Sequence, residues 1–208
     1  MREEVSQVST VPTPASTAEA LAMLKSATRY LAAADPTEMA AAEQAECLQS
    51  LEEADAVRTA ARALIINGFT ASQGYCADGA YSPRSWLIHQ TRVTKGAAAG
   101  HIAWARRARA HPKVLQALAT AQLTESYART ICGWTDQIPE DCRNDADAIL
   151  TGAAGSGMDL RDLAALAAAI QARSRSDTPD DDGPGRLFED RALRLETTFQ
   201  GAGVLSGI

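Results

Sequence analysis

Apolar residues recur every three or four positions over most of the chain, which is typical of amphipathic helices. A first helix is predicted with Thr17 as its cap and an end near Asp35-Pro36, because proline pushes the preceding residue out of the α region. A second is predicted from Thr37 to Ile66, where Asn67-Gly68 would supply a left-handed stop. We expect its buried stripe to comprise Cys47, Leu48, Leu51, Ala54, Val57, Ala61, Leu64 and Ile65.

The middle of the chain predicts an ordered loop followed by shorter helices. The stretch from Phe69 to Tyr81 has no helical period and contains the turn signal Asp78-Gly79. Residues that cap or open helices then follow at Ser82-Pro83, Thr94, Pro112, Thr124 and Pro139. The helix from Pro139 should break at the small residues 152–157, and a last helix should begin at Asp159.

The pattern changes after this last helix. Residues 174–185 include four aspartates, two prolines and two glycines, which is typical of a flexible acidic linker. Beyond residue 186, Leu193, Leu195 and Phe199 alternate with polar residues and predict a β-hairpin. A lone hairpin is marginal in water. Either this tail folds onto the helices or, as we favour, the chain is a truncated form of a longer one, and the exposed strand edge would then promote self-association.

These segments predict a mainly α fold. The expected organisation is a disordered lead-in over residues 1–16, a helical domain over 17–173, the linker over 174–185 and the truncated β-hairpin segment over 186–208. Within the helical domain we expect a multi-helix bundle containing a helix-turn-helix-like pair. Hydrophobic residues make up 46% of the chain but aromatic residues only 5%, so small apolar side chains should allow the helices to pack closely.

Charge and cysteine content narrow the class of protein. The net charge of −6 argues against a uniformly basic coat, although it leaves room for local patches. The four cysteines form no CxxC pair and follow no secretory leader, which predicts reduced thiols and a cytoplasmic location. No apolar run reaches the roughly 18 residues of a membrane-spanning helix, so we expect no membrane partner.

Motifs for catalysis or cofactor binding are missing from the sequence. The spacing of His89, His101 and His111 places no two of them on one helical face beside a third ligand, so no metal site is predicted. The glycines of residues 152–157 lack the Lys-Ser/Thr end of a phosphate-binding loop, and no nucleophile elbow occurs. We therefore predict no catalytic residues, no cofactor and no enzymatic activity for this chain as it stands.

The informative feature is a basic segment. Between Asp78 and Glu125 the chain contains seven of its 20 basic residues and none of its 26 acidic residues. The rest of the chain therefore has 13 basic and 26 acidic residues, so this segment is a local concentration of positive charge. We predict that these seven residues contact nucleic acid. They are Arg84, Arg92, Lys95, Arg106, Arg107, Arg109 and Lys113.

Part of this segment has the spacing of a helix-turn-helix. Trp86-Leu87-Ile88 would lie on the first helix, Thr91-Arg92-Val93 in the turn, and Thr94 would cap a second helix that carries basic side chains. Arg92 departs from the pattern, because glycine commonly fills that position and a positive φ costs a larger residue steric energy. An ordinary helical hairpin with a solvated basic face remains an equal alternative.

The same residues carry a family resemblance. The runs from Cys76 to Leu87, Thr91 to Thr94, Ala105 to Arg107 and Leu123 to Ile131 resemble domain of unknown function 222, the 13E12 repeat family. This is the N-terminal domain of actinobacterial HNH endonuclease-type proteins. Further agreement lies at Ile138-Pro139, Asp159 to Leu163, and Arg191 to Leu195 with Gly201 and Leu205, so the similarity spans roughly Ala60 to the C-terminus.

The resemblance implies a DNA-related function for the parent protein. Longer members of that family continue into a C-terminal HNH module, in which histidines and an asparagine bind a divalent metal that activates water. No residue of this chain matches those ligands, so the resemblance assigns no catalytic role here. Our leading hypothesis is a DNA-binding or DNA-targeting accessory domain, and the alternative is a helical protein-interaction or self-association module without nucleic-acid contact.

Overall fold

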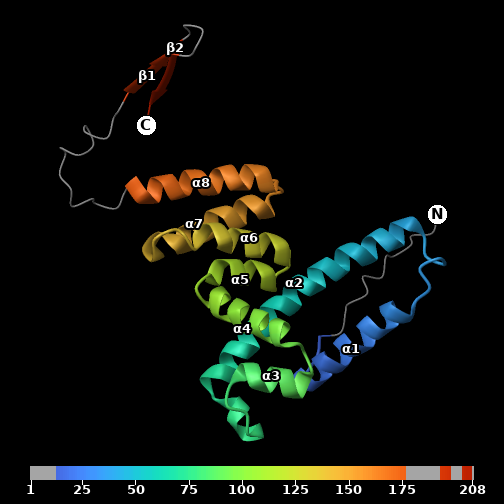
Figure 1. Ribbon diagram of the computed structural model, residues 1–208. Helices are drawn as coiled ribbons and strands as arrows, with labels where there is room; N and C mark the ends of the chain where they lie inside the picture. The colour runs from blue at the N-terminus through green and yellow to red at the C-terminus, as the bar shows by residue number, and fades with distance from the viewer. Residues whose placement is uncertain (1–12, 177–192, 198–202, 208) are drawn as a thin grey trace, which may run out of the picture. The chain divides into compact units, whose positions relative to one another are not determined.

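The computed structural model describes residues 13–176, 193–197 and 203–207 (Figure 1). Within these residues the chain forms eight α-helices, one 3-10 helix and two short strands, so the prediction of a mainly helical fold is confirmed. The chain divides into two compact units, Met1–Leu51 and Glu52–Ile208. In the described residues no helix combines the length and apolarity needed to cross a bilayer.

The first unit contains helix α1 (Thr17–Ala33) and the beginning of α2 (Ala41–Ala71). The cap of α1 is Ser16 and not Thr17, because the Ser16 hydroxyl oxygen accepts the amide hydrogen of Glu19 at 3.2 Å. Helix α2 starts later than the predicted Thr37, since the Asp35 carboxylate accepts the amide and hydroxyl hydrogens of Thr37 and holds a turn there.

The predicted end of the second helix was wrong. Helix α2 continues through Asn67 and Gly68 to Ala71, and the left-handed residue is Gln73, with φ of 54°. Asn67 stays helical because its side-chain amide donates to the carbonyl oxygen of Ala105 at 2.9 Å, a tertiary contact that a local stop signal does not include.

The predicted buried stripe of α2 was also wrong. In the second unit the helix buries a different face, made of Ala56, Thr59, Ala60, Ala63 and Ile66. Leu64 and Ile65 are 54% and 69% exposed, and Leu48 and Leu51 of the first unit are exposed as well. Alanine methyl groups let the backbone of α2 approach its neighbours closely, which larger leucine and isoleucine side chains would prevent.

The predicted loop after α2 contains a 3-10 helix, η1 (Gly74–Asp78), closed by Gly79 with φ of 71°. An aromatic group holds the loop: the ring of Phe69 meets the ring of Trp86 edge-on at 4.7 Å between centroids. The Trp86 indole donates to the Asp78 carboxylate at 2.6 Å. A side chain at Gly74 would collide with the Phe69 ring at 2.6 Å, so glycine is required there by close approach.

Six further helices complete the second unit: α3 (Pro83–Thr91), α4 (Lys95–Arg109), α5 (Pro112–Ala119), α6 (Glu125–Thr135), α7 (Glu140–Gly155) and α8 (Leu160–Ser176). The predicted caps are confirmed, since Ser82, Thr94 and Thr124 each accept an amide hydrogen three residues on. At the start of α8, Asp159 accepts the amide hydrogens of Arg161 and Asp162, which are two and three residues on.

Helix α7 continues past its predicted break at Gly152 and ends at Gly155. Gly152 has helical backbone, and the left-handed residue after the helix is Gly157, with φ of 90°. Helices α4 to α8 stack one on the next in Figure 1, and α7 packs against α5, α6 and α8. Their core includes Leu118, Ile131, Leu150 and Leu163, all fully buried.

After α8 the structure describes only strands β1 (Leu193–Thr197) and β2 (Gly203–Gly207), which pair antiparallel with Leu195 opposite Leu205. Their side chains lie outside the described residues, as do the predicted linker over residues 177–185 and most of the lead-in. Residues 174–176, predicted to start the linker, belong instead to α8. Self-association through the hairpin edge therefore stays a prediction.

Candidate functional site

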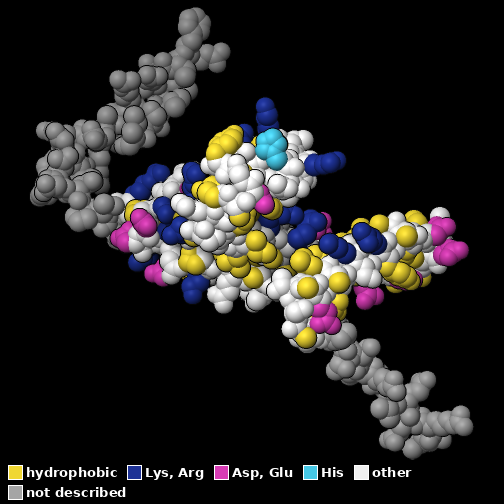
Figure 2. Space-filling view, turned by 90° about the horizontal axis from the view of Figure 1, so that it is seen from below, with side chains coloured by type: hydrophobic (Ala, Val, Ile, Leu, Met, Phe, Trp, Pro, Cys, Tyr) yellow, Lys and Arg dark blue, Asp and Glu magenta, His cyan; other side chains and the backbone are white. Residues whose placement is uncertain are grey.

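The basic segment lies on three consecutive helices and the turn between two of them. Arg84 is in the first turn of α3, Lys95 begins α4, and Lys113 is near the start of α5. Six of the seven basic side chains are exposed, and within the described chain no ion pair joins any of these six to an acidic residue. On the face drawn in Figure 2, Lys and Arg side chains lie in several separate places, with Asp and Glu side chains among them.

Lys95, Arg106 and Arg109 form a basic stripe along α4. At 100° per residue they fall within about 60° of arc, and 14 residues at 1.5 Å each separate the ends by about 21 Å. All three are exposed, and the buried residues of α4, such as Ala105 and Ala108, lie to one side of the stripe. The stripe is therefore long and narrow enough to follow a phosphate backbone.

Arg92 occupies the turn between α3 and α4 with φ of 57° and ψ of 24°. This is the left-handed region, which costs a residue with a Cβ roughly 1–2 kcal/mol relative to right-handed backbone. No hydrogen bond or ion pair of its exposed side chain occurs in the described structure. The sequence thus places a cation where backbone energetics alone favour glycine.

Arg107 differs from the other six basic residues. Its guanidinium forms an ion pair with Asp136 at 2.7 Å, and only a third of the side chain is exposed. The neighbouring Arg106 and Arg109 make no such pair in the described structure. Sequence reasoning missed this distinction because Asp136 is 29 residues away, at the end of α6.

Asp136 connects Arg107 to a buried hydrogen-bond network centred on His111. The imidazole is fully buried, with Nε2 2.8 Å from Asp136 Oδ1 and Nδ1 2.8 Å from Asp147 Oδ2. Thr135 donates to the other oxygen of Asp147 at 2.7 Å. These contacts tie the start of α5 to the end of α6 and the middle of α7.

Sequence reasoning did not find this network, although one signal was present. Asp147 is an acidic residue among the buried positions of α7, next to Ala146 and three residues before Leu150. A carboxylate in an apolar stripe requires a partner. The sequence offers no means of choosing His111 as that partner over the other histidines.

The network shifts the pKa values of its members. Burial opposes the charge on His111, but hydrogen bonds to Asp147 and Asp136 overcome this and raise the pKa of the imidazole. Burial also opposes the charge of Asp136, whereas its bond to His111 and the nearby Arg107 lower its pKa. Burial, helped by Asp147, raises the pKa of the adjacent Cys132 thiol to about 12, so this cysteine is not an activated nucleophile.

These directions predict how stability depends on pH. A raised pKa of His111 stabilises the fold fully below the unfolded value of about 6.5, and this contribution is lost as pH rises through the folded pKa. The depressed pKa of Asp136 contributes above about 3.9 and is lost as pH falls through its folded value. The contribution of His111 should therefore make the urea midpoint fall as the pH rises from about 5.5 to about 9, while the lowered pKa of His101 opposes this fall near pH 6.5. In a His111→Asn variant that fall should shrink; an unchanged fall would show that another group causes it.

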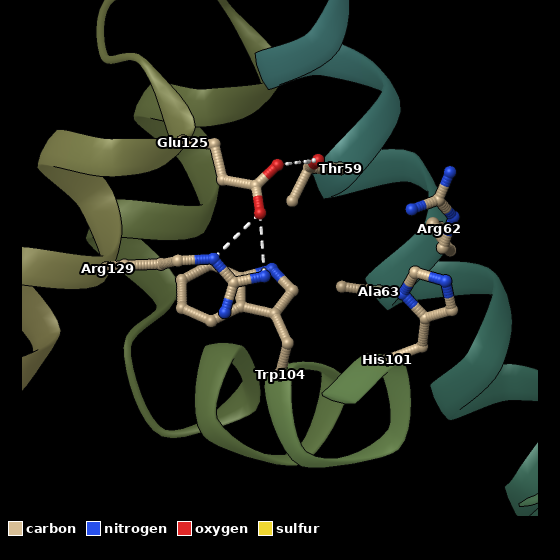
Figure 3. Close-up of a pocket in the computed structure, with 7 residues that line it drawn as sticks. All are labelled: Thr59, Arg62, Ala63, His101, Trp104, Glu125 and Arg129. Carbon is tan, nitrogen blue, oxygen red and sulfur yellow. Dashed lines mark hydrogen bonds and ion pairs between the residues drawn. The ribbon is translucent and has the colours of Figure 1, made fainter. Parts of the chain in front are cut away.

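A second polar cluster lies between α2, α4 and α6 (Figure 3). Glu125 accepts hydrogen bonds from the Thr59 hydroxyl and the Arg129 guanidinium, both at 2.7 Å. The Arg129 guanidinium carbon lies 4.5 Å from the ring centroid of Trp104, a cation–π contact. Arg62 and His101 lie across a small pocket from this group, which no sequence pattern indicated.

Neither cluster resembles a metal centre. Among the described residues no group of three or more His, Cys, Asp or Glu side chains is arranged to hold a metal ion. Comparison of the chain with models of protein families, with curated proteins and with solved structures gives no match.

Proposed function

We propose that this protein binds nucleic acid as a DNA-binding or DNA-targeting accessory domain, in the setting of an HNH endonuclease-type protein as the family resemblance implies. The observation that carries the proposal is the set of six exposed basic side chains, on α3, α4, α5 and the turn, without acidic partners in the described structure. In this proposal the chain supplies binding and not hydrolysis, and it acts in the cytoplasm, where DNA is accessible.

The turn geometry supports a helix-turn-helix-like arrangement of α3 and α4. The two helices pack together, three residues separate them, and the first of these, Arg92, is left-handed. Thr94 then caps α4 by accepting the amide hydrogen of Ala97 at 3.2 Å. A turn of three or four residues between two packed helices, often with glycine at a left-handed position, is typical of the motif.

The exposed face of α4 favours backbone contacts over reading of bases. The exposed residues that flank the basic stripe on α4 are small, including Gly96, Gly100 and Ala103, and their side chains cannot donate a hydrogen bond to a base edge. Small side chains let the helix approach DNA closely, while the cations at both ends contact phosphates. We therefore expect binding that depends strongly on salt and weakly on DNA sequence.

The test replaces Lys95, Arg106 and Arg109 together by glutamine. Loss of about three phosphate contacts should make the slope of log K against log salt less negative by about 2.7, at roughly 0.9 per contact. Fluorescence anisotropy of a labelled duplex at several salt concentrations measures both slopes. Arg107 is kept, because its ion pair with Asp136 would confound binding with stability.

The matched control replaces Arg161, Arg173 and Arg175 of α8 by glutamine, which removes the same charge from exposed positions outside the basic segment. It should keep the wild-type slope, and equal effects of the two triple variants would indicate net charge alone. No duplex binding at low salt would favour the alternative, a protein-interaction module. In that case the exposed apolar side chains of Val57, Leu64 and Ile65 on α2 would be the candidate surface for a protein partner.

Arg92→Gly separates binding from stability. Glycine adopts positive φ without steric cost, so the substitution should raise the free energy of unfolding by about 1 kcal/mol. The larger conformational entropy of glycine in the unfolded chain offsets part of this gain. The same change removes a cation and should weaken duplex binding. Urea unfolding and anisotropy on one preparation measure both, and a variant that binds as tightly as wild type would remove Arg92 from the interface.

A further inference from the structure

The pocket lined by α2, α4 and α6 contains a buried donor without an acceptor. Trp104 is only 5% exposed, and its indole nitrogen has no hydrogen-bond partner in the described structure. This side chain lines the pocket, with Arg62 and His101 on one side and Glu125 and Arg129 on the other (Figure 3). Because buried N–H groups are nearly always hydrogen-bonded, the indole indicates an acceptor that enters from outside the chain.

The charge around the pocket favours an anion. Glu125 is the only carboxylate that lines it, and both of its oxygens are already engaged by Thr59 and Arg129. Arg129 neutralises Glu125, which leaves the guanidinium of Arg62 without an ion pair in the described residues. One positive charge therefore remains for a ligand.

The histidine beside the pocket adds a donor without adding charge. Burial first, and then the positive charges of Arg62 and Arg129, lower the pKa of His101, while Glu125 acts in the opposite direction. The imidazole is thus neutral at physiological pH and offers one N–H. Together with the indole and guanidinium groups it makes a lining rich in donors.

The size of the pocket selects among anions. Its inner volume is about 30 Å³, two to three times the roughly 10–15 Å³ that a cavity needs to hold one water molecule. One end of a planar carboxylate fits such a space. A phosphate group would bring more oxygens and a second negative charge next to Glu125, which the single uncompensated cation does not balance.

We propose that this pocket binds the carboxylate of a small monocarboxylic acid, with the indole N–H of Trp104 and the guanidinium of Arg62 as its donors. The site is separate from the proposed nucleic-acid interface. At 100° per residue, His101 and Trp104 lie about 120° and 180° around α4 from Lys95, away from the basic stripe. Either proposal can therefore fail without the other.

The experiment follows the indole N–H resonances of the ¹⁵N-labelled full chain during titration with acetate at constant ionic strength. Trp104→Phe assigns the Trp104 signal, and Trp86→Phe with Trp134→Phe assigns it by elimination if that variant does not fold. The Trp104 signal should move along a saturable curve. The Trp86 signal should not move, because that indole already donates to Asp78.

Two arginines of α2 give a matched pair of variants. Arg62→Gln should weaken acetate binding about tenfold or more, as expected for loss of a charge-assisted hydrogen bond. Arg58→Gln removes the same charge from a side chain that does not line the pocket, and should keep wild-type affinity. A Trp104 shift that does not saturate, that chloride or inorganic phosphate reproduces equally, or that both variants weaken alike would overturn the proposal.

Discussion

Replacing Asp147 by alanine should lower the free energy of unfolding by about 3–5 kcal/mol, the usual cost of removing one partner from a buried ion pair. Asp147 and His111 are both fully buried and 2.8 Å apart. Without Asp147, the imidazole retains Asp136 and a longer contact of 3.3 Å with the Thr135 hydroxyl, and Thr135 loses the carboxylate to which it donates. The loss would be a large fraction of the total stability of a domain of this size.

Urea denaturation followed by circular dichroism measures this loss. Asp145→Ala is the matched control, because Asp145 is exposed on the same helix, α7, and its removal should change stability by about 0.5 kcal/mol or less. Asp147→Asn keeps the shape and part of the hydrogen bonding and should fall between the two. If Asp147→Ala costs no more than the control, the network does not hold α5, α6 and α7 together.

Ile66→Ala should lower the free energy of unfolding by about 2–5 kcal/mol, whereas Ile65→Ala should change it by about 0.5 kcal/mol or less. The two isoleucines are neighbours on α2 with the same chemistry. Ile66 is 7% exposed and belongs to the core, while Ile65 is 69% exposed. Only the first variant leaves a cavity.

The comparison tests which face of α2 is buried. Both variants exchange isoleucine for alanine within the same helix, so the difference in helix propensity is common to them and cancels. Matched urea unfolding curves give the difference directly. A larger loss for Ile65→Ala would restore the stripe that hydrophobic periodicity predicts and contradict the observed packing.

Local chemistry was sufficient to predict the helices and most of their starts. Ser82, Thr94, Thr124 and Asp159 cap helices as predicted, because a cap depends on a side chain and an amide two or three residues away. The positive φ of Arg92 is the conformation that the helix-turn-helix hypothesis implied for this position, whereas the alternative of an ordinary hairpin left it open. The basic segment is also a property of the sequence alone, since it depends only on which residues occur.

Features that depend on distant neighbours required the tertiary structure. Asn67-Gly68 is a typical local signal for the end of a helix, but the hydrogen bond from the Asn67 side chain to the Ala105 carbonyl oxygen stabilises helical backbone at this position. Hydrophobic periodicity predicted that the leucine and isoleucine side chains form the buried face of α2. In the structure the buried face consists mainly of alanines, because the helices pack closely. Hydrophobic patterning measures transfer from water, and it does not measure how closely two backbones can approach.

The candidate site divides in the same way. The sequence by itself determined which side chains are basic, and their spacing along α4 determined that three of them share a stripe. Only the tertiary structure decided that Arg107 pairs with Asp136, that His111 joins Asp147, and that Trp104 faces a pocket with Arg62. These partners lie 29 to 42 residues apart in the chain. An electrostatic or hydrogen-bond contact depends on distance in space, which sequence separation does not specify until the helices have packed.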